Sequence, residues 1–211
     1  MLLPAFPQLQ RIVYIFVTID KTVAVLHEIE PFYNWRHLYQ SEEDEYSPFY
    51  GREYSEFEFS NTIYNYYIHP QWDEFGSRTL YLKILFVDYE QQTAIIELIG
   101  EWNDAVENDI MQLKRSVIDP LLSKQVYKYI LIAENVLNFH SSDTEYYEEW
   151  QEELSEDAGW IAILNAPQQT GAEMKAGKLG HYLHFFEQLN WRVYTPEHLL
   201  HLVEQKLLLL P

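Results

Sequence analysis

The second half of the chain alternates short apolar runs with helix-forming segments, and this alternation constrains the fold most strongly. Residues 129–133 and 160–164 are continuous runs of aliphatic and aromatic residues, typical of strands that are covered on both faces. Strands joined by helices pair in parallel through right-handed crossovers. We therefore expect both runs to be central, parallel, and adjacent or nearly so in one sheet.

The other elements follow from periodicity and turn chemistry. Runs at 79–87 and 93–99 predict a hairpin, and a run at 62–68 predicts a third strand that precedes it in a meander. An apolar stripe predicts a helix that covers the sheet and is capped by Asn103 or Asp104; its members are Val106, Ile110, Leu113, Val117 and Leu121. Further predictions are helices at 143–154 and 172–189, a strand at 191–194 and a last helix from Pro196.

The predicted fold class is α/β: a mixed β-sheet built from a β-hairpin followed by a βαβαβα run, plus an aromatic-rich α+β N-terminal portion. We expect a domain over 78–211 and place the N-terminal portion, 1–77, on that sheet or as its extension. Residues 12–19 predict a strand, and 23–29 fit either a second strand or a short helix. Residues 34–59 show no period, and we expect them to wrap the surface with their aromatic side chains tucked in.

Composition narrows the functional classes. The 211 residues include no cysteine, which excludes disulfide scaffolds, thiolate metal sites and thiol catalysis. The formal charge of −19 opposes binding to nucleic acid. No apolar run reaches the length of about 20 residues that a membrane span needs, so we expect no membrane insertion and a cytoplasmic location. Acidic blocks at 42–58 and 143–157 suit solvated faces, or attraction of a basic partner or a divalent cation.

The order of elements from about residue 79 to 206 resembles a known module. The hairpin strand IIELIGE at 95–101, the segment NFHSSD at 138–143 that opens a helix, and the closing TPEHL at 195–199 are similar to the sulfate-transporter and anti-sigma-antagonist (STAS) domain. The family's turn reads Asp-Ser-Ser/Thr-Gly, and in the antagonists its first serine is phosphorylated; the resemblance gives that role to Ser141. Here His140 stands in place of the Asp and Asp143 in place of the Gly.

The turn His140, Ser141, Ser142, Asp143 is the main candidate for a regulatory or ligand site. A loop from the carboxyl end of a central strand into a helix brings together free amide donors, hydroxyls and a histidine. Ser142 and Glu145 also have capping-box spacing, so we expect Ser142 to cap the helix. Glu134 and Asn135 join the candidate site because they follow the predicted strand at 129–133.

Other constellations carry less chemistry. His69 and Asp73 lie in one polar turn, where they suit an acid–base pair or bonds to the loop backbone. His181 and His184, and His198 and His201, have i, i+3 spacing, but their helical phases predict exposure, not a metal site. A nuclease core needs a lysine two residues after Glu97, where isoleucine stands. We predict no metal and no cofactor, because phosphate-loop and dinucleotide signatures are missing from the sequence.

Two classes of function follow. The first is a protein–protein interaction or regulatory module. Its partner is a protein, and the acidic blocks favour one with a basic surface. The alternative is a small-molecule hydrolase or other enzyme that uses Glu134, His140 and Ser141. The 17 Tyr, the 6 Trp and the apolar ending at 207–210 also predict a homodimer through aromatic or leucine contacts.

Overall fold

The computed structural model describes residues 13–19, 22–55, 58–59, 61–63 and 66–209. Its centre is a five-stranded mixed sheet in the order β5-β6-β7-β8-β9. β5 and β6 form an antiparallel hairpin, and the remaining pairs are parallel. The strands span Leu80–Asp88, Thr93–Asn103, Lys128–His140, Trp160–Leu164 and His184–Phe186. The predicted mixed sheet and α/β class are confirmed, and so are the central, parallel and adjacent positions of residues 129–133 and 160–164.

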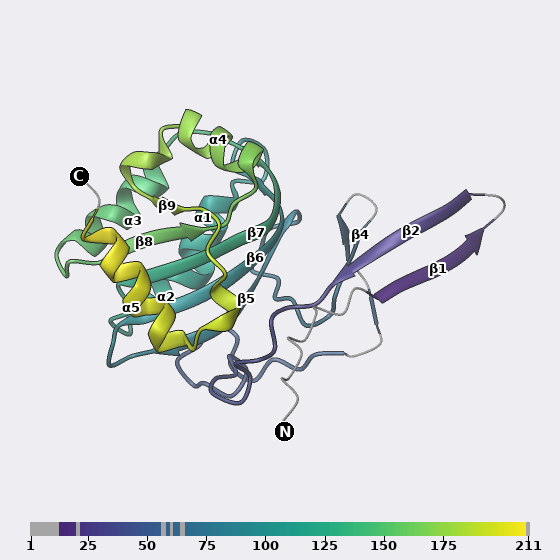
Figure 1. Ribbon diagram of the computed structural model, residues 1–211, viewed down its shortest axis with the longest axis horizontal. Helices are drawn as coiled ribbons and strands as arrows, with labels where there is room; N and C mark the ends of the chain where they lie inside the picture. The colour runs from purple at the N-terminus through teal and green to yellow at the C-terminus, as the bar shows by residue number, and fades with distance from the viewer. Residues whose placement is uncertain (1–12, 20–21, 56–57, 60, 64–65, 210–211) are drawn as a thin grey trace, which may run out of the picture.

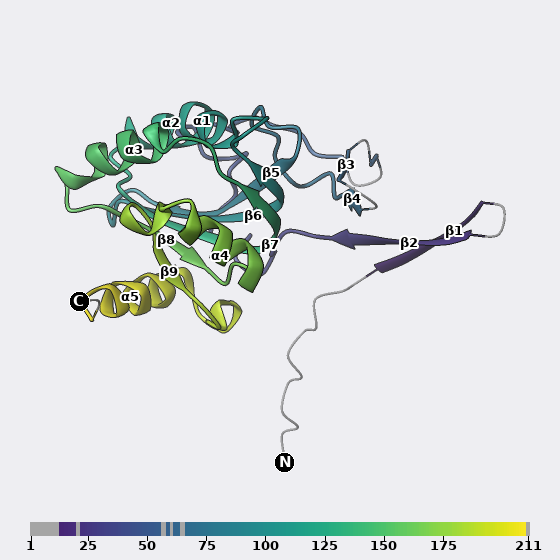
Figure 2. The ribbon, with the colours of Figure 1, turned by 90° about the horizontal axis from the view of Figure 1, so that it is seen from above.

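Helices cover both faces of this sheet (Figures 1 and 2). One face carries α1, a π-helical turn, α2, α3 and α4, which span Asp109–Leu113, Lys114–Ile118, Asp119–Leu122, Glu145–Ser155 and Gln168–Ala176. The other face carries α5, Pro196–Leu207. Alternate residues of the central strands fill two separate cores: Leu131 lies in the first, while Ile130 and Ile132 lie in the second with Trp191 and Leu199.

The N-terminal strands build a second, four-stranded sheet. β1 (Val13–Ile19) and β2 (Thr22–Ile29) form an antiparallel hairpin that projects from the body (Figure 1). β2 then pairs with β4 (Tyr66–Ile68), and β4 with β3 (Thr62–Ile63). The strand predicted at 12–19 is therefore found over 13–19, residue 12 lies outside the described residues, and 23–29 is a strand. The predicted meander is wrong, because residues 62–63 and 66–68 form two short strands of this second sheet.

The aromatic segment between β2 and β3 runs in turns over the body. Trp35 and Phe49 are buried, 4% exposed each, whereas Tyr46 and Tyr50 are exposed. Trp35 donates its Nε1–H to the Tyr194 carbonyl at 3.2 Å. The expected tucking-in of aromatic side chains therefore holds for part of the segment.

The helix after β6 starts later than its apolar stripe suggests. Val106 is 75% exposed, and the backbone of Asn108 is left-handed, with φ 54°. A side chain rarely continues a helix through that conformation, so α1 begins at Asp109. The four later stripe residues are buried as predicted: Ile110, Leu113, Val117 and Leu121.

The largest error concerns residues 172–194. α4 ends at Ala176, and Lys178 takes a left-handed backbone with φ 64°. Residues 184–186 then form β9 along the free edge of β8, whereas the predicted strand at 191–194 is a 3₁₀ turn, Trp191–Val193. His181 and His184 consequently do not share a helix. His198 and His201 are exposed on α5, as predicted.

Candidate functional site

The turn 140–143 joins the end of β7 to the start of α3, and all four of its residues are exposed. The carbonyl of His140 accepts hydrogen bonds from the amides of Asp104, at 2.9 Å, and Ala105, at 3.3 Å. These bonds tie the turn to the end of β6, because β6 and β7 still pair at Asn103 and His140. The first residue of the turn, His140, is therefore held by backbone contacts, while the four side chains face solvent.

Carboxylates stand on two sides of this turn. The His140 ring places Nε2 2.8 Å from Glu101 Oε1, with the His140 side chain 52% exposed and that of Glu101 13% exposed. On α4, Glu173 accepts from the Phe139 amide at 3.3 Å, and hydrogen bonds from Gln169 and then from Phe139 lower the pKa of Glu173. The contact with Glu101 fixes the direction of the histidine ring, and Glu173 adds a second negative charge next to the turn.

A buried carboxylate supports the turn from beneath. Asp104 is 3% exposed; its Oδ1 accepts from Trp102 Nε1 and from the Ile110 amide, both at 2.9 Å. Its Oδ2 accepts from the Tyr147 hydroxyl at 2.7 Å. Burial raises the pKa of Asp104 to about 6. Asp104 thus joins β6, α1 and α3. The predicted cap at Asn103 or Asp104 is wrong, because the N-cap residue of α1 is Asn108, although Asp104 accepts from the Ile110 amide in the first turn of that helix.

Ser142 does not cap α3, which contradicts the capping-box prediction. The helix begins at Glu145 with Thr144 as its N-cap residue, and no side-chain hydrogen bond closes that cap. Because the helix starts two residues after the expected position, Ser142 lies outside its first turn. Within the described residues, the side chains of Ser141, Ser142 and Asp143 have no hydrogen-bond or ion-pair partner. These three side chains are therefore available to a second molecule.

Glu134 and Asn135 do not belong to this surface. β7 runs on to His140, so Glu134 lies six residues upstream, about 20 Å along an extended strand. Glu134 forms an ion pair with Arg192 and accepts from Trp191 Nε1 at 3.0 Å and Asn165 Nδ2 at 2.6 Å. The pairing of β7 with β8 ends at Ile132, which explains why the sequence suggested a strand end. The predicted single site therefore divides into separate places.

Asn135 follows a register shift in the β6–β7 ladder and pairs with Ile99. It lines a cavity between the two sheets, away from Arg192. No sequence signal reveals this shift, because it adds a residue inside an otherwise continuous strand.

Of the two alternatives for His69 and Asp73, an acid–base pair or bonds to the loop backbone, the structure shows a backbone bond for His69 and no contact between the two side chains. Asp73 is fully buried and accepts from Arg52 Nη1 at 2.9 Å and the Tyr54 hydroxyl at 2.6 Å, with Lys83 Nζ 3.3 Å away. The His69 Nδ1 accepts from the Gln71 amide at 3.2 Å. Burial raises the pKa of Asp73 despite its cationic neighbours. This cluster binds the N-terminal loop to β5.

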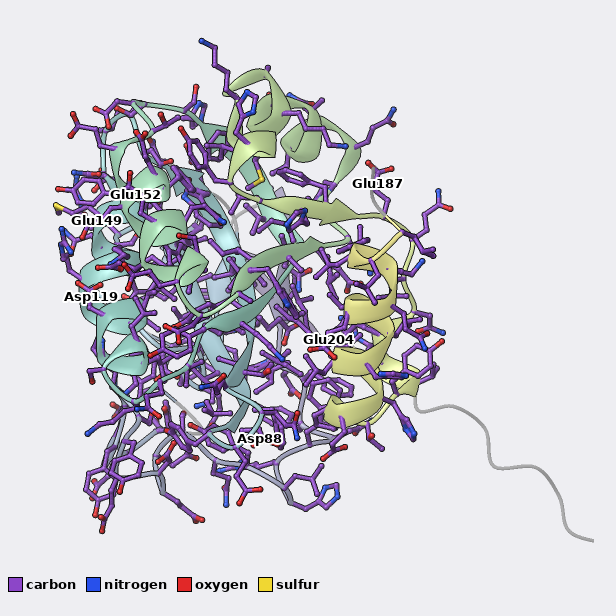
Figure 3. The ribbon with its side chains drawn as sticks, turned by 90° about the vertical axis from the view of Figure 1, so that its left-hand side faces the viewer. Asp88, Asp119, Glu149, Glu152, Glu187 and Glu204 are labelled. Atoms are coloured by element: carbon purple, nitrogen blue, oxygen red, sulfur yellow. The ribbon has the colours of Figure 1, made fainter. Side chains whose placement is uncertain are left out.

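A strongly acidic surface lies on α2 and α3. Figure 3 shows Asp119, Glu149 and Glu152 on this side of the molecule. Lys114, whose side chain is 0% exposed, pairs with Asp119, with Glu149 at 3.5 Å and with Glu153 at 2.7 Å. In the described part of the chain, no group of three or more His, Asp and Glu is arranged to hold a metal ion. Nor is any described helix long and apolar enough to cross a membrane.

No family model matches the chain, and no curated protein sequence matches it. Among solved structures, the anti-sigma factor antagonist SpoIIAA in its unphosphorylated form is 18% identical, over 59% of this chain and 96% of that one, with a TM-score of 0.44. A putative anti-sigma factor antagonist from Thermotoga maritima is 16% identical, over 51% and 86%, with a TM-score of 0.38. The phosphorylated Bacillus SpoIIAA is 20% identical, over 58% and 98%, with a TM-score of 0.38. These matches cover 51–59% of this chain and 86–98% of each neighbour.

Proposed function

We propose that the chain is a regulatory protein–protein interaction module whose contact surface is the turn 140–143. The observation that carries this proposal is the exposure of four consecutive polar residues on a turn whose first residue, His140, is tied by its backbone to the end of β6. A binding surface benefits from such a fixed point, because less conformational freedom is lost when the partner docks.

The enzyme alternative is not favoured, because Glu134 is bound to other residues and not to His140 or Ser141. A hydrolase built on Glu134, His140 and Ser141 needs these groups within hydrogen-bonding reach of one another. Glu134 is instead bound by Arg192, Trp191 and Asn165, while His140 is paired with Glu101. Ser141 is therefore better suited to recognition than to catalysis.

A charge change at Ser141 suits a regulatory switch. Ser141 lies three residues before Thr144, the N-cap residue of α3, so the helix dipole acts only weakly on a negative group there. Asp143 and Glu145 follow it in the chain and repel an added phosphate. Phosphorylation of Ser141 would therefore change the charge of an exposed surface and would leave the core unchanged. We expect it to alter the affinity for a partner rather than the stability of the fold.

Substitution at Ser141 tests the proposal. Proteins retained by the chain from an extract of the cells that make it are first identified, and binding is then measured by calorimetry with the purified partner. We expect Ser141→Asp to weaken binding about tenfold, because the added carboxylate must lose its hydration where the turn meets the partner, with a melting temperature within a few degrees of the parent. Ser141→Ala and Ser123→Asp, an exposed serine beyond α2, serve as controls that keep full affinity. Equal affinity of Ser141→Asp and the parent would overturn the proposal.

We also infer that the partner is basic and that the chain forms a homodimer. The acidic surface of α2 and α3 favours a cationic partner, whose binding should weaken with salt. Leu208 and Leu209 at the end of α5 are 85% and 83% exposed. Neighbouring exposed leucines of this kind support self-association. A cytoplasmic location and a boundary near residue 77 remain predictions.

A further inference from the structure

A buried lysine and a buried aspartate face each other beside β5. Lys83 of β5 is 9% exposed, and Asp73, in the loop before that strand, is 0% exposed. The backbone holds them together: the Asp73 amide donates to the Leu82 carbonyl at 2.7 Å, and the Leu82 amide donates to the Asp73 carbonyl at 3.1 Å. Lys83 Nζ lies 3.3 Å from Asp73 Oδ2. An amine and a carboxyl group are thus in contact and shut off from water.

Neither atom of this contact is satisfied by a hydrogen bond. Lys83 Nζ and Asp73 Oδ2 are both sealed from solvent and, among the described residues, form no well-aligned hydrogen bond. Buried charges are costly without such bonds. Burial accordingly raises the pKa of Asp73 and lowers the pKa of Lys83. Both shifts favour the uncharged forms, a nucleophilic amine and a carboxylic acid that an amine can attack.

The other neighbours of the pair suit transfer of an acyl group. Asp73 Oδ1 accepts from Arg52 Nη1 at 2.9 Å and from the Tyr54 hydroxyl at 2.6 Å. These two donors stabilise the negative oxygen that forms when an amine adds to the carboxyl carbon. Glu42 Oε2 lies 3.7 Å from Lys83 Nζ, within reach for taking up a proton. The cluster therefore holds a nucleophile, an acyl group, an oxyanion site and a base.

We propose that Lys83 and Asp73 join through an isopeptide bond, an amide between their side chains. Lys83 Nζ adds to Asp73 Cγ, and the Glu42 carboxylate removes a proton from the nitrogen. Glu42 passes this proton to Oδ2, the bond from Cγ to Oδ2 breaks, and Oδ2 leaves as water. One amine and one acid give one amide and one water, so no co-reactant is needed. The fixed contact and the exclusion of water favour the reaction.

Lys114 is a buried lysine that we do not expect to react. Its carboxylate neighbours Asp119, Glu149 and Glu153 have side chains that are 33%, 35% and 44% exposed, so they stay hydrated. Burial acts to lower the pKa of Lys114, but hydrogen bonds to Asp119 and Glu153 raise it overall. A charged amine has no lone pair with which to attack. Lys114 thus provides a comparison within the same chain.

Mass spectrometry of the intact, denatured full chain tests the proposal. We expect a mass lower than that of the sequence by one water molecule. Trypsin then locates the bond, because it cleaves after Arg52, Arg78 and Lys114 but not after an acylated Lys83. Residues 53–78 and 79–114 should therefore be released as one branched peptide.

Three variants separate the reacting groups. Lys83→Arg keeps the charge but has no lysine amine, so it should show the full mass of its sequence. Glu42→Gln should form the bond about a hundredfold more slowly, as for the loss of a general base. Glu43→Gln changes the neighbouring exposed acid and should react as the parent does. Chains sampled at intervals after cell-free synthesis give the rates.

Two results in the parent chain overturn the proposal, and neither depends on the folding of a variant. The first is that the folded chain keeps the full mass of its sequence at every time after synthesis. The second is that one water is lost while trypsin still releases residues 53–78 and 79–83 as separate peptides, because the water then comes from another residue. Equal rates in Glu42→Gln and the parent would overturn the role of Glu42.

Discussion

Glu97 is a buried carboxylic acid whose pKa is raised by the fold. Its side chain on β6 is 0% exposed, and Oε2 accepts from the Phe32 amide at 2.9 Å. Oε1 lies 3.7 Å from Arg192 Nη2, and no described group forms a hydrogen bond with it. Burial raises the pKa of Glu97 from 4.5 to about 7, although the Phe32 amide and Arg192 act in the opposite direction. The protonated acid is thus the better-tolerated form in the folded chain.

This pKa predicts how stability depends on pH. A carboxyl group whose pKa is raised by folding binds its proton more tightly in the folded state, so its contribution is complete below pH 4.5 and is lost as pH rises through about 7. Asp104, raised from 3.8 to about 6, acts with the same sign. We expect Glu97→Gln, which cannot ionise, to lose less stability than the parent between pH 5 and pH 8.

Urea unfolding midpoints at the two pH values provide the measurement. Glu197→Gln, at an exposed position on α5, is the matched control and should follow the parent. The same change in midpoint for Glu97→Gln and the parent would contradict this prediction. It would mean that the pKa of Glu97 is the same in the folded and the unfolded chain.

At the scale of elements, strands covered on both faces were predictable and edge elements were not. Residues 129–133 and 160–164 stand out because burial on two faces removes every polar alternation. β9 has three half-buried residues with one neighbouring strand, so it leaves no such pattern. The apolar residues of 172–189 match a helical period by coincidence, since Leu179 and Leu183 enter the core from a 3₁₀ turn and the loop after it.

Helices α3 and α5 were both predicted to begin near a hydroxyl residue, Ser142 and Thr195, but only Thr195 makes a capping hydrogen bond. Thr195 caps α5, and its Oγ1 accepts from the His198 amide at 3.4 Å, whereas Ser142 stands outside α3. We therefore expect Thr195→Ala to lower the free energy of unfolding by about 1 kcal/mol and Ser142→Ala to leave it unchanged. Chemical unfolding of the two variants beside the parent gives both values. A comparable loss in Ser142→Ala would mean that α3 is capped as the sequence suggested.

At the scale of the whole molecule, the N-terminal portion completes the body. Phe32 and Trp35 pack edge-on against Trp191, with ring centroids 4.7 and 5.5 Å away. The position of the turn 140–143 was predictable, because it follows directly from a buried strand and precedes an amphipathic helix. Its separation from Glu134 was not, because the length of β7 and its register shift depend on pairing with β6.

Self-association is the prediction that belongs to this scale. Exposure of Leu208 and Leu209 favours a dimer in which these side chains are covered. We expect light scattering at tens of micromolar protein to give twice the chain mass of 25.3 kDa. The double variant Leu208→Glu, Leu209→Glu should give the mass of one chain with an unchanged circular dichroism spectrum. A parent protein that scatters as a single chain would contradict the homodimer.

Site-specific photo-cross-linking tests the central claim, that the turn 140–143 is where a partner binds. A photoreactive amino acid replaces Ser141 in one version of the chain and the exposed Glu197 of α5, on the opposite face of the sheet, in another. After irradiation in the cells that make the protein, our account predicts a cross-link to a second polypeptide from position 141 and none from position 197. Cross-links from position 197 with none from position 141 would contradict it.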